Sequence, residues 1–168
     1  MWGSISLTMT YAHYVRLAEL GRQGKLRAGY FLKLALPFEF IIDGPPVSQQ
    51  ARRRERVRQW RQEVRSVAEQ YWPVEEILVT GSVMITITYF YDSVEMDVDN
   101  IPKPISDALK GLVYLDDGQV TDILCRKRNL NGNLRLENPS IVLAEGLSRG
   151  NEFLYILVEE APNQEVID

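Results

Sequence analysis

Two closely spaced acidic pairs are the part of this sequence best suited to chemistry. The first pair is Asp97 and Asp99, just after an alternating apolar segment, and the second is Asp116 and Asp117. In an extended D-x-D segment the two carboxylates point the same way, because side chains repeat every second residue. Carboxylate oxygens favour magnesium or manganese over zinc, and no His or Cys lies between the two pairs. The pattern predicts a divalent-cation site, with a solvated turn as the alternative.

A lysine follows the first acidic pair. Lys103 comes four residues after Asp99 and stands between Pro102 and Pro104. Carboxylates that hold magnesium can activate water and relieve charge on a phosphodiester under attack, and a fixed ammonium group can pair with the phosphate or the leaving oxygen. These residue types therefore suit phosphodiester hydrolysis. The alternative for Lys103 is a surface lysine at a helix start, where a cation opposes the helix dipole.

The order and spacing of these elements resemble the RusA-type Holliday-junction resolvases. The family pattern D-x-D-N-x-x-K, D-A-L and D-D-x-Q-V stands here as DVDNIPK from Asp97, DAL from Asp107 and DDGQV from Asp116. The likeness extends over about residues 36–130. Several separated elements match together, which makes the pattern far more specific than any one of them.

The resemblance implies a magnesium-dependent crossover junction endodeoxyribonuclease, with manganese as a possible substitute. It implies that Asp97, Asp99 and Asp117 bind the metal ion and that Lys103 assists cleavage. The substrate would be a four-way junction formed in DNA recombination and repair. Because such a junction is cut on two opposed strands, one acidic site per chain also predicts a homodimer.

Two basic clusters are candidates for DNA binding. One lies on a helix predicted from about Gln50 to Tyr71, whose apolar residues recur at intervals of three and four. The other lies on the strand that follows Gln119. Arginine suits bidentate phosphate contact, although a solvated helix face is an equally good interpretation. The candidates are Arg52, Arg53, Arg54, Arg126, Lys127 and Arg128.

The predicted elements give an α+β fold. It is a single RusA-like domain in which one long and one short helix flank a mixed β-sheet. The short helix is expected from Pro104 to Lys110, closed by Gly111. Residues 129–151 are expected to form a long loop, interrupted by the apolar segment Ile141–Ala144. The predicted strands are Phe38–Ile42, Val83–Tyr91, the segment after Gln119, and Phe153–Glu159.

The domain limits follow from the same patterns. Residues 1–33 form an N-terminal extension of unknown role with a short helix at Tyr11–Leu20, residues 34–162 form the nuclease domain, and 163–168 form a tail.

The net charge of -4 argues against a strongly basic, indiscriminate nucleic-acid binder. The only cysteine, Cys125, fits a reducing compartment, and no membrane span or secretory signal is apparent, so we expect a cytoplasmic protein.

Two other functions remain open from the sequence. D-x-D after an apolar strand is also the nucleophile motif of haloacid-dehalogenase-type phosphotransferases, but Asn100 stands where that motif has Thr or Val. A non-catalytic or more broadly structure-selective DNA-binding relative would keep the fold and lose an acidic ligand or Lys103. Asp92 and Glu95 precede the D-x-D where some relatives carry arginines, which leaves junction selectivity open.

Overall fold

A computed structural model describes residues 36–50, 54–72, 78–93 and 96–166. They belong to one compact unit, Ala35–Asp168. The helix predicted at Tyr11–Leu20 and two of the basic candidates, Arg52 and Arg53, lie outside the described residues.

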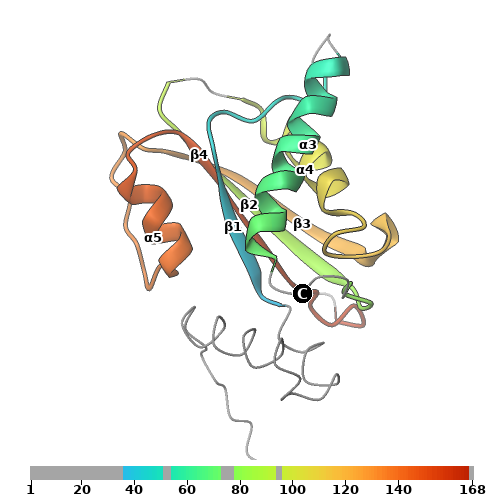
Figure 1. The fold of residues 1–168 in the computed structure, drawn as a ribbon. Helices are drawn as coiled ribbons and strands as arrows, with labels where there is room; N and C mark the ends of the chain where they lie inside the picture. Colours follow the sequence, from blue (N-terminus) through green and yellow to red (C-terminus); the bar gives the residue numbers. More distant parts are fainter. Residues whose placement is uncertain (1–35, 51–53, 73–77, 94–95, 167–168) are drawn as a thin grey trace, which may run out of the picture. The chain divides into compact units, whose positions relative to one another are not determined.

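The centre of this unit is a mixed sheet of four strands in the order β1-β4-β2-β3 (Figure 1). The strands are β1 (Phe38–Asp43), β2 (Val83–Tyr91), β3 (Val120–Asn129) and β4 (Phe153–Glu160). β4 runs antiparallel to β1 and β2, and β2 runs parallel to β3. The predicted mixed sheet is confirmed. The antiparallel neighbours do not fit the doubly wound parallel sheet expected of a haloacid-dehalogenase-type phosphotransferase.

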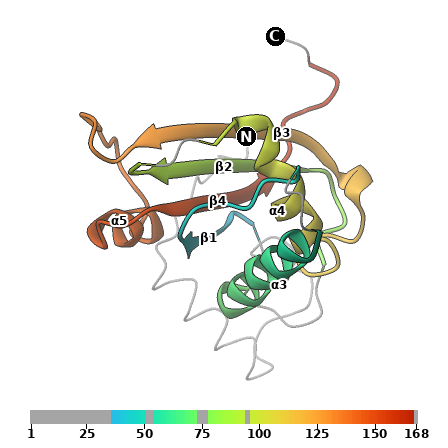
Figure 2. The same ribbon diagram turned by 90° about the horizontal axis from the view of Figure 1, so that it is seen from above.

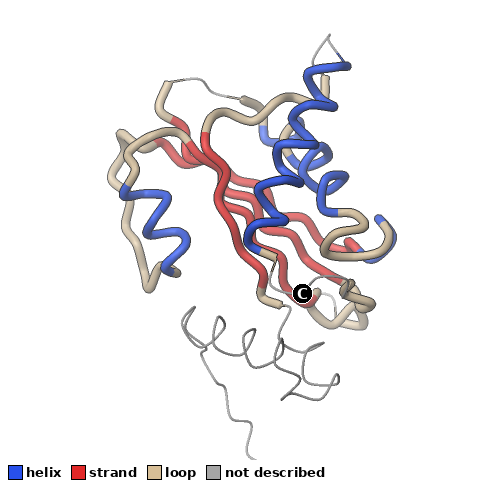
Figure 3. Tube along the Cα trace, in the orientation of Figure 1, coloured by secondary structure: helices blue, strands red, loops and turns tan. Residues whose placement is uncertain are grey.

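Three described helices flank the sheet (Figure 3). The long helix α3 (Arg54–Tyr71) and the short helix α4 (Pro102–Leu109) lie on one face, and α5 (Ile141–Ser148) lies on the other. None of them is long and apolar enough to cross a membrane. The sequence prediction of one long and one short helix therefore missed a second short helix.

The predicted apolar stripe of α3 is confirmed. Trp60, Val64 and Ala68 are buried against the sheet, and Val67 and Tyr71 pack beside them. These residues meet the odd-numbered side chains of β2, which the period-two pattern also placed on one face. Gln49 and Gln50 lie in a turn, and the described helix runs from Arg54 to Tyr71.

The other face of the sheet carries a smaller core under α5. Phe90 and Phe153 stack with ring centroids 4.6 Å apart, and Ile41, Val142 and Tyr155 complete the cluster. β2 is thus buried on both faces, which explains why its whole length is rich in apolar residues.

The segment 129–151, predicted to be a loop, contains α5. Ser140 caps the helix: its Oγ accepts a hydrogen bond from Leu143 N at 3.1 Å and donates one to Glu39 Oε2 on β1 at 2.7 Å. The loop prediction was wrong because Ser, Gly and Asn flank a helix of only two turns, and its stability comes from tertiary packing that composition does not reveal.

Replacing Gly146 with Ala should detach α5 from the sheet. A Cβ at this position would lie 2.5 Å from Cε2 of the Phe153 ring, which is itself held in the stack with Phe90. We expect a loss of about 2 kcal/mol in the free energy of unfolding, measured by urea denaturation. Gly81→Ala is the matched control, since nothing lies within 4 Å of its added Cβ. Equal stabilities of the two variants would contradict this role of Gly146 in seating α5.

Candidate active site

The D-x-D segment is not extended as the sequence predicted. Asp97 has an extended backbone, with φ -67° and ψ 134°, but Asp99 lies inside the short 3₁₀ helix η1 (Val98–Asn100). A hydrogen bond from Asn100 N to Asp97 O, 3.1 Å long, closes the turn. The prediction that both carboxylates project from an extended segment is therefore wrong, because only Asp97 has an extended backbone. Both aspartates are exposed to solvent.

Helix α4 follows directly and carries Lys103 in its first turn. The helix starts at Pro102, two residues earlier than predicted, because a proline in the first turn lacks only an N–H that would have no intrahelical acceptor. Ile101, Ile105 and Leu109 are fully buried under α3 and the sheet. Lys103 therefore stands on a helix whose apolar side is fixed in the core. Gly111, with φ +69°, ends this element as predicted.

The second acidic pair is held by a capping box. Asp116 Oδ1 accepts from Gly118 N at 3.0 Å, and Gln119 Oε1 accepts from Leu115 N and Asp116 N at 2.8 and 2.9 Å. Gln119 Nε2 in turn donates to the carbonyls of Val79 and Gly81. Asp116 and Gln119 thus shape the turn η2 (Asp117–Gln119). Gln119 was not predicted to have a role, although the spacing D-x-x-Q is itself a capping-box signal.

A buried tyrosine anchors the loop that leads into this turn. The Tyr114 hydroxyl donates to the carbonyl of Ser106 at 2.7 Å and lies 3.1 Å from the Ser106 Oγ. Burial raises the pKa of Tyr114 to about 12, so its hydroxyl stays protonated and keeps this bond. The loop between α4 and η2 is therefore tied back to α4 itself.

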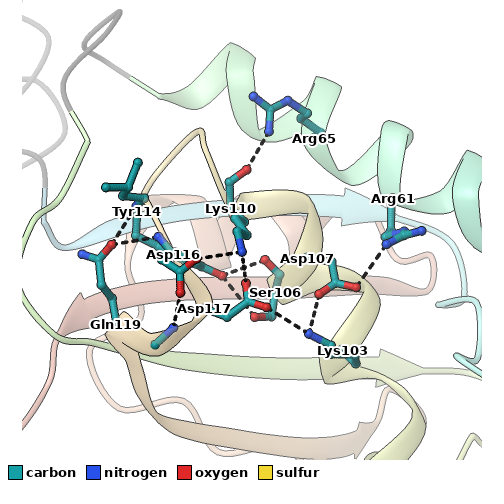
Figure 4. A network of polar contacts seen from close by, with 12 residues as sticks. Arg61, Arg65, Lys103, Ser106, Asp107, Lys110, Tyr114, Asp116, Asp117 and Gln119 are labelled. Atoms are coloured by element: carbon teal, nitrogen blue, oxygen red, sulfur yellow. Dashed lines mark hydrogen bonds and ion pairs between the residues drawn. The ribbon is translucent and has the colours of Figure 1, made fainter.

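These two anchored segments bring charged groups into one network (Figure 4). Lys103 Nζ lies 2.6 Å from Asp107 Oδ1 and 3.4 Å from Asp117 Oδ2. Lys110 Nζ lies 2.9 Å from Asp116 Oδ2 and 3.5 Å from Asp117 Oδ1. The carboxylate of Asp117 therefore stands between two ammonium groups. Lys103 and Asp117, two of the predicted site residues, are thus brought together from two separate elements.

The network keeps its lysines charged. The pKa of Lys103 is raised, first by its hydrogen bond to Asp107 and further by Asp117. The pKa of Asp116 is lowered, first by the Gly118 N–H and then by Lys110. Because a lysine with a raised pKa stays protonated at neutral pH, Lys103 can supply a fixed positive charge and is unsuited to act as a base.

Asp107 links this network to α3. Its Oδ1 forms an ion pair with the Lys103 ammonium, and its Oδ2 forms an ion pair with Arg61 Nη1 at 3.1 Å. The side chain of Asp107 is 23% exposed, compared with 48% for Lys103. Arg61 lies on the helix face that the sequence predicted to be basic. Its guanidinium group reaches α4 and fixes the carboxylate of Asp107, which in turn holds Lys103.

Arg65 fastens the other end of α4. Its guanidinium donates to three carbonyl oxygens at the C-terminal end of the helix, where backbone acceptors lack intrahelical partners. The acceptors are Ala108 O at 3.3 Å, Lys110 O at 2.9 Å and Gly111 O at 3.3 Å. Part of the basic face of α3 therefore serves packing between the two helices.

The structure divides the remaining DNA-binding candidates. Arg54 is exposed at the start of α3. On β3, Arg126 donates from Nε to Thr88 Oγ1 at 3.1 Å, and Arg128 lies on that same face by strand alternation. Lys127 belongs to the opposite face, with Cys125, which packs against the main core under α4. Only one of the three basic residues of β3 thus shares a face with the acidic network.

The acidic residues fit a hard metal ion in their donor chemistry. Asp97, Asp99 and Asp117 offer only carboxylate oxygens, and all three are exposed. Among the described residues, however, no three His, Cys, Asp or Glu side chains are grouped so that they could hold a metal ion. The assignment of these three ligands stays a prediction.

Comparison with known protein families gives a match over the part of the chain that holds the site. The family described as Endodeoxyribonuclease RusA matches residues 45–137, more than half of the 168 residues. The matched range contains η1, α4, η2 and β3, and so includes every residue of the polar network. No curated protein matches the chain.

Truncating Arg65 should destabilise the helix pair. Arg65→Ala leaves three carbonyls at the end of α4 without their donor, so we expect a loss of about 2 kcal/mol in unfolding free energy, measured by urea denaturation. Arg58→Ala is the control on the same helix, because Arg58 pairs with the exposed Glu55 three residues away. Its effect should stay within about 0.5 kcal/mol. If both variants lose the same stability, the role of Arg65 in fixing α4 is refuted.

Proposed function

The chain belongs to the RusA endodeoxyribonuclease family, and we propose that it is a magnesium-dependent endonuclease that resolves four-way DNA junctions by paired phosphodiester hydrolysis. The observation that carries the proposal is the contact between Lys103 and Asp117, 3.4 Å apart. Lys103 belongs to the DVDNIPK motif and Asp117 belongs to the DDGQV motif. Their contact places an ammonium group next to a carboxylate at the exposed surface of the protein.

The roles follow from the charges. Asp97, Asp99 and Asp117 would hold Mg²⁺, or Mn²⁺ in its place, and the bound ion would supply an activated water and relief of charge at the phosphate. Lys103 keeps a positive charge for the scissile phosphate or the leaving oxygen. Asp107 and Arg61 orient Lys103 through the contacts of 2.6 and 3.1 Å.

The DNA path is proposed to use two groups of basic residues, one near the start of the long helix in the sequence and one on β3. Arg52, Arg53 and Arg54 precede or begin α3, close in sequence to the part of that helix that packs on α4. Lys127 lies on the sheet face that α4 covers. Contacts of this kind fix affinity and register on the phosphate backbone and carry no base specificity. Two opposed cuts need two sites, so we propose a homodimer.

A non-catalytic, structure-selective DNA-binding relative is the second candidate. It is favoured by one observation: the described carboxylates do not converge in a group of three. Cleavage assays separate the two functions directly, because such a relative would bind junctions and leave every phosphodiester intact.

Neutralising any one of the three proposed ligands should abolish cleavage. Asp97→Asn, Asp99→Asn and Asp117→Asn each remove a metal-binding charge, and they also remove repulsion of phosphate, so junction binding should stay equal or become tighter. The measurement is nicking of a labelled four-way junction and a matched linear duplex, with and without magnesium. Calcium should support binding without turnover.

The control for this series is Asp43→Asn. Asp43 is an exposed carboxylate paired with Arg149 at 3.0 Å, so it tests whether removal of any surface charge affects nicking. We expect its cleavage rate to match that of the unaltered protein. A normal rate for Asp117→Asn would refute the site assignment, and magnesium-independent nicking would refute the metal requirement.

Replacing Arg52, Arg53 and Arg54 by Ala should weaken DNA binding and flatten its salt dependence. The slope of log affinity against log salt should fall by about one unit for every phosphate that an arginine no longer neutralises. Binding to the junction is measured over a range of salt concentrations. Arg135→Ala is the control, since that side chain is 88% exposed and paired with Glu137. An unchanged slope in the triple variant would assign these arginines to a solvated face.

A further inference from the structure

Lys110 is a second lysine of the polar network, and the proposed function gives it no role. It stands at the C-terminal end of α4, the short helix that packs beside α3 (Figure 2). Its ammonium group lies 2.9 Å from Asp116 Oδ2 and 3.5 Å from Asp117 Oδ1 (Figure 4). Asp117 is one of the three carboxylates proposed to hold the metal ion. A cation of the protein itself therefore contacts a proposed metal ligand.

The backbone of Lys110 is held by both helices. Its N–H donates to Ser106 O at 3.2 Å, in the last turn of α4, and its carbonyl accepts from Arg65 Nη1 of α3 at 2.9 Å. A cation at the C-terminal end of a helix is also favoured by the helix dipole. The point from which the lysine side chain starts is thus fixed by the packing of α3 on α4.

The ammonium group of Lys110 is held beside Asp117 by Asp116. Asp116 Oδ1 accepts from Gly118 N at 3.0 Å within the capping box, so this carboxylate is fixed in orientation, and its Oδ2 pairs with Lys110. The pKa of Lys110 is raised, first by this hydrogen bond to Asp116, so the lysine stays protonated at neutral pH. The capping box therefore keeps a positive charge beside Asp117.

The two lysines that contact Asp117 are held by different partners. Lys103 has its shorter contact, 2.6 Å, with Asp107, a carboxylate of α4 that is tied to Arg61. Lys110 instead contacts both members of the second acidic pair, within the turn that carries the proposed ligand. Its side chain is 42% exposed, so it can leave Asp117 without disturbing the core. These contacts suit Lys110 to modulate the charge of Asp117.

An ammonium group and a divalent cation compete for one carboxylate, because both are attracted to the same negative charge and each repels the other. We propose that Lys110 competes with the metal ion for Asp117 and so sets the metal concentration at which the site fills. The proposal rests on the proposed function, in which Asp117 is a metal ligand.

Removing the charge of Lys110 tests the competition. Lys110→Gln should lower the dissociation constant for Mn²⁺ by about tenfold, whereas Lys110→Arg, which keeps the charge, should stay within about threefold of the unaltered chain. Free Mn²⁺ is measured by electron paramagnetic resonance, with the full chain and without DNA. Arg135→Gln is the matched control, because it removes one positive charge from an exposed pair with Glu137 that is not part of the network. Its dissociation constant should equal that of the unaltered chain.

The magnesium dependence of junction nicking gives a second readout. In Lys110→Gln the magnesium concentration for half-maximal nicking should fall by about tenfold. An unchanged Mn²⁺ dissociation constant in Lys110→Gln would overturn the proposal, and so would equally tight binding by Lys110→Arg. Slower nicking at every magnesium concentration, with unchanged Mn²⁺ affinity, would assign Lys110 to phosphate contact and would also overturn it.

Asp117→Asn separates failure of this proposal from failure of the proposed function. If Asp117→Asn weakens Mn²⁺ binding while Lys110→Gln has no effect, the competition alone is refuted. If neither variant changes Mn²⁺ binding, Asp117 is not a ligand and the proposed function loses its metal site. Absence of saturable Mn²⁺ binding in both the unaltered chain and Lys110→Gln would refute the two together.

Discussion

The pairing of the Asp107 carboxylate with Lys103 and Arg61 is the interaction on which the proposed active site depends. One carboxylate oxygen forms an ion pair with Lys103 and the other forms an ion pair with Arg61. A single side chain therefore sets the position of the lysine and ties it to the long helix. Arg65 fixes the far end of α4 from the same helix. A short helix has little stability of its own and takes its position from such contacts. The basic face of α3 is therefore partly internal structure, and counting its arginines overstates the charge available to DNA.

Periodic and strongly apolar elements could be predicted from the sequence. The buried stripe of α3, the alternation of side chains along β2 and the end of α4 at Gly111 are as expected, because each depends on local spacing or on one residue with a positive φ. Helix α5 was missed, since its stability depends on Phe153 and on the bond between Ser140 and Glu39, residues distant in the chain. The 3₁₀ turn at Asp99 was missed because D-x-D spacing does not distinguish a strand from a tight turn.

The candidate site, too, could be predicted only in part from the sequence. The resemblance to the family motifs predicted that Lys103 and Asp117 belong to one site, and the structure brings them to 3.4 Å. The spacing D-x-x-Q signals the capping box formed by Asp116, but no spacing could predict that Asp107 would be shared between a lysine and an arginine. The position of Asp116 depends on where the loop after α4 turns, and the bond from the buried Tyr114 to Ser106 anchors that loop. Asp107 and Asp116 therefore act by positioning other groups of the network.

The edge strand constrains where DNA can lie. Arg126 donates a hydrogen bond to Thr88 on the α5 face. Arg128 shares that face, so both arginines are turned away from the acidic network. Lys127 alone of this cluster faces α4, and Arg54 stands exposed at the start of α3. In the proposed function, phosphate would therefore approach along the sheet face that carries α4, on which the acidic network also lies.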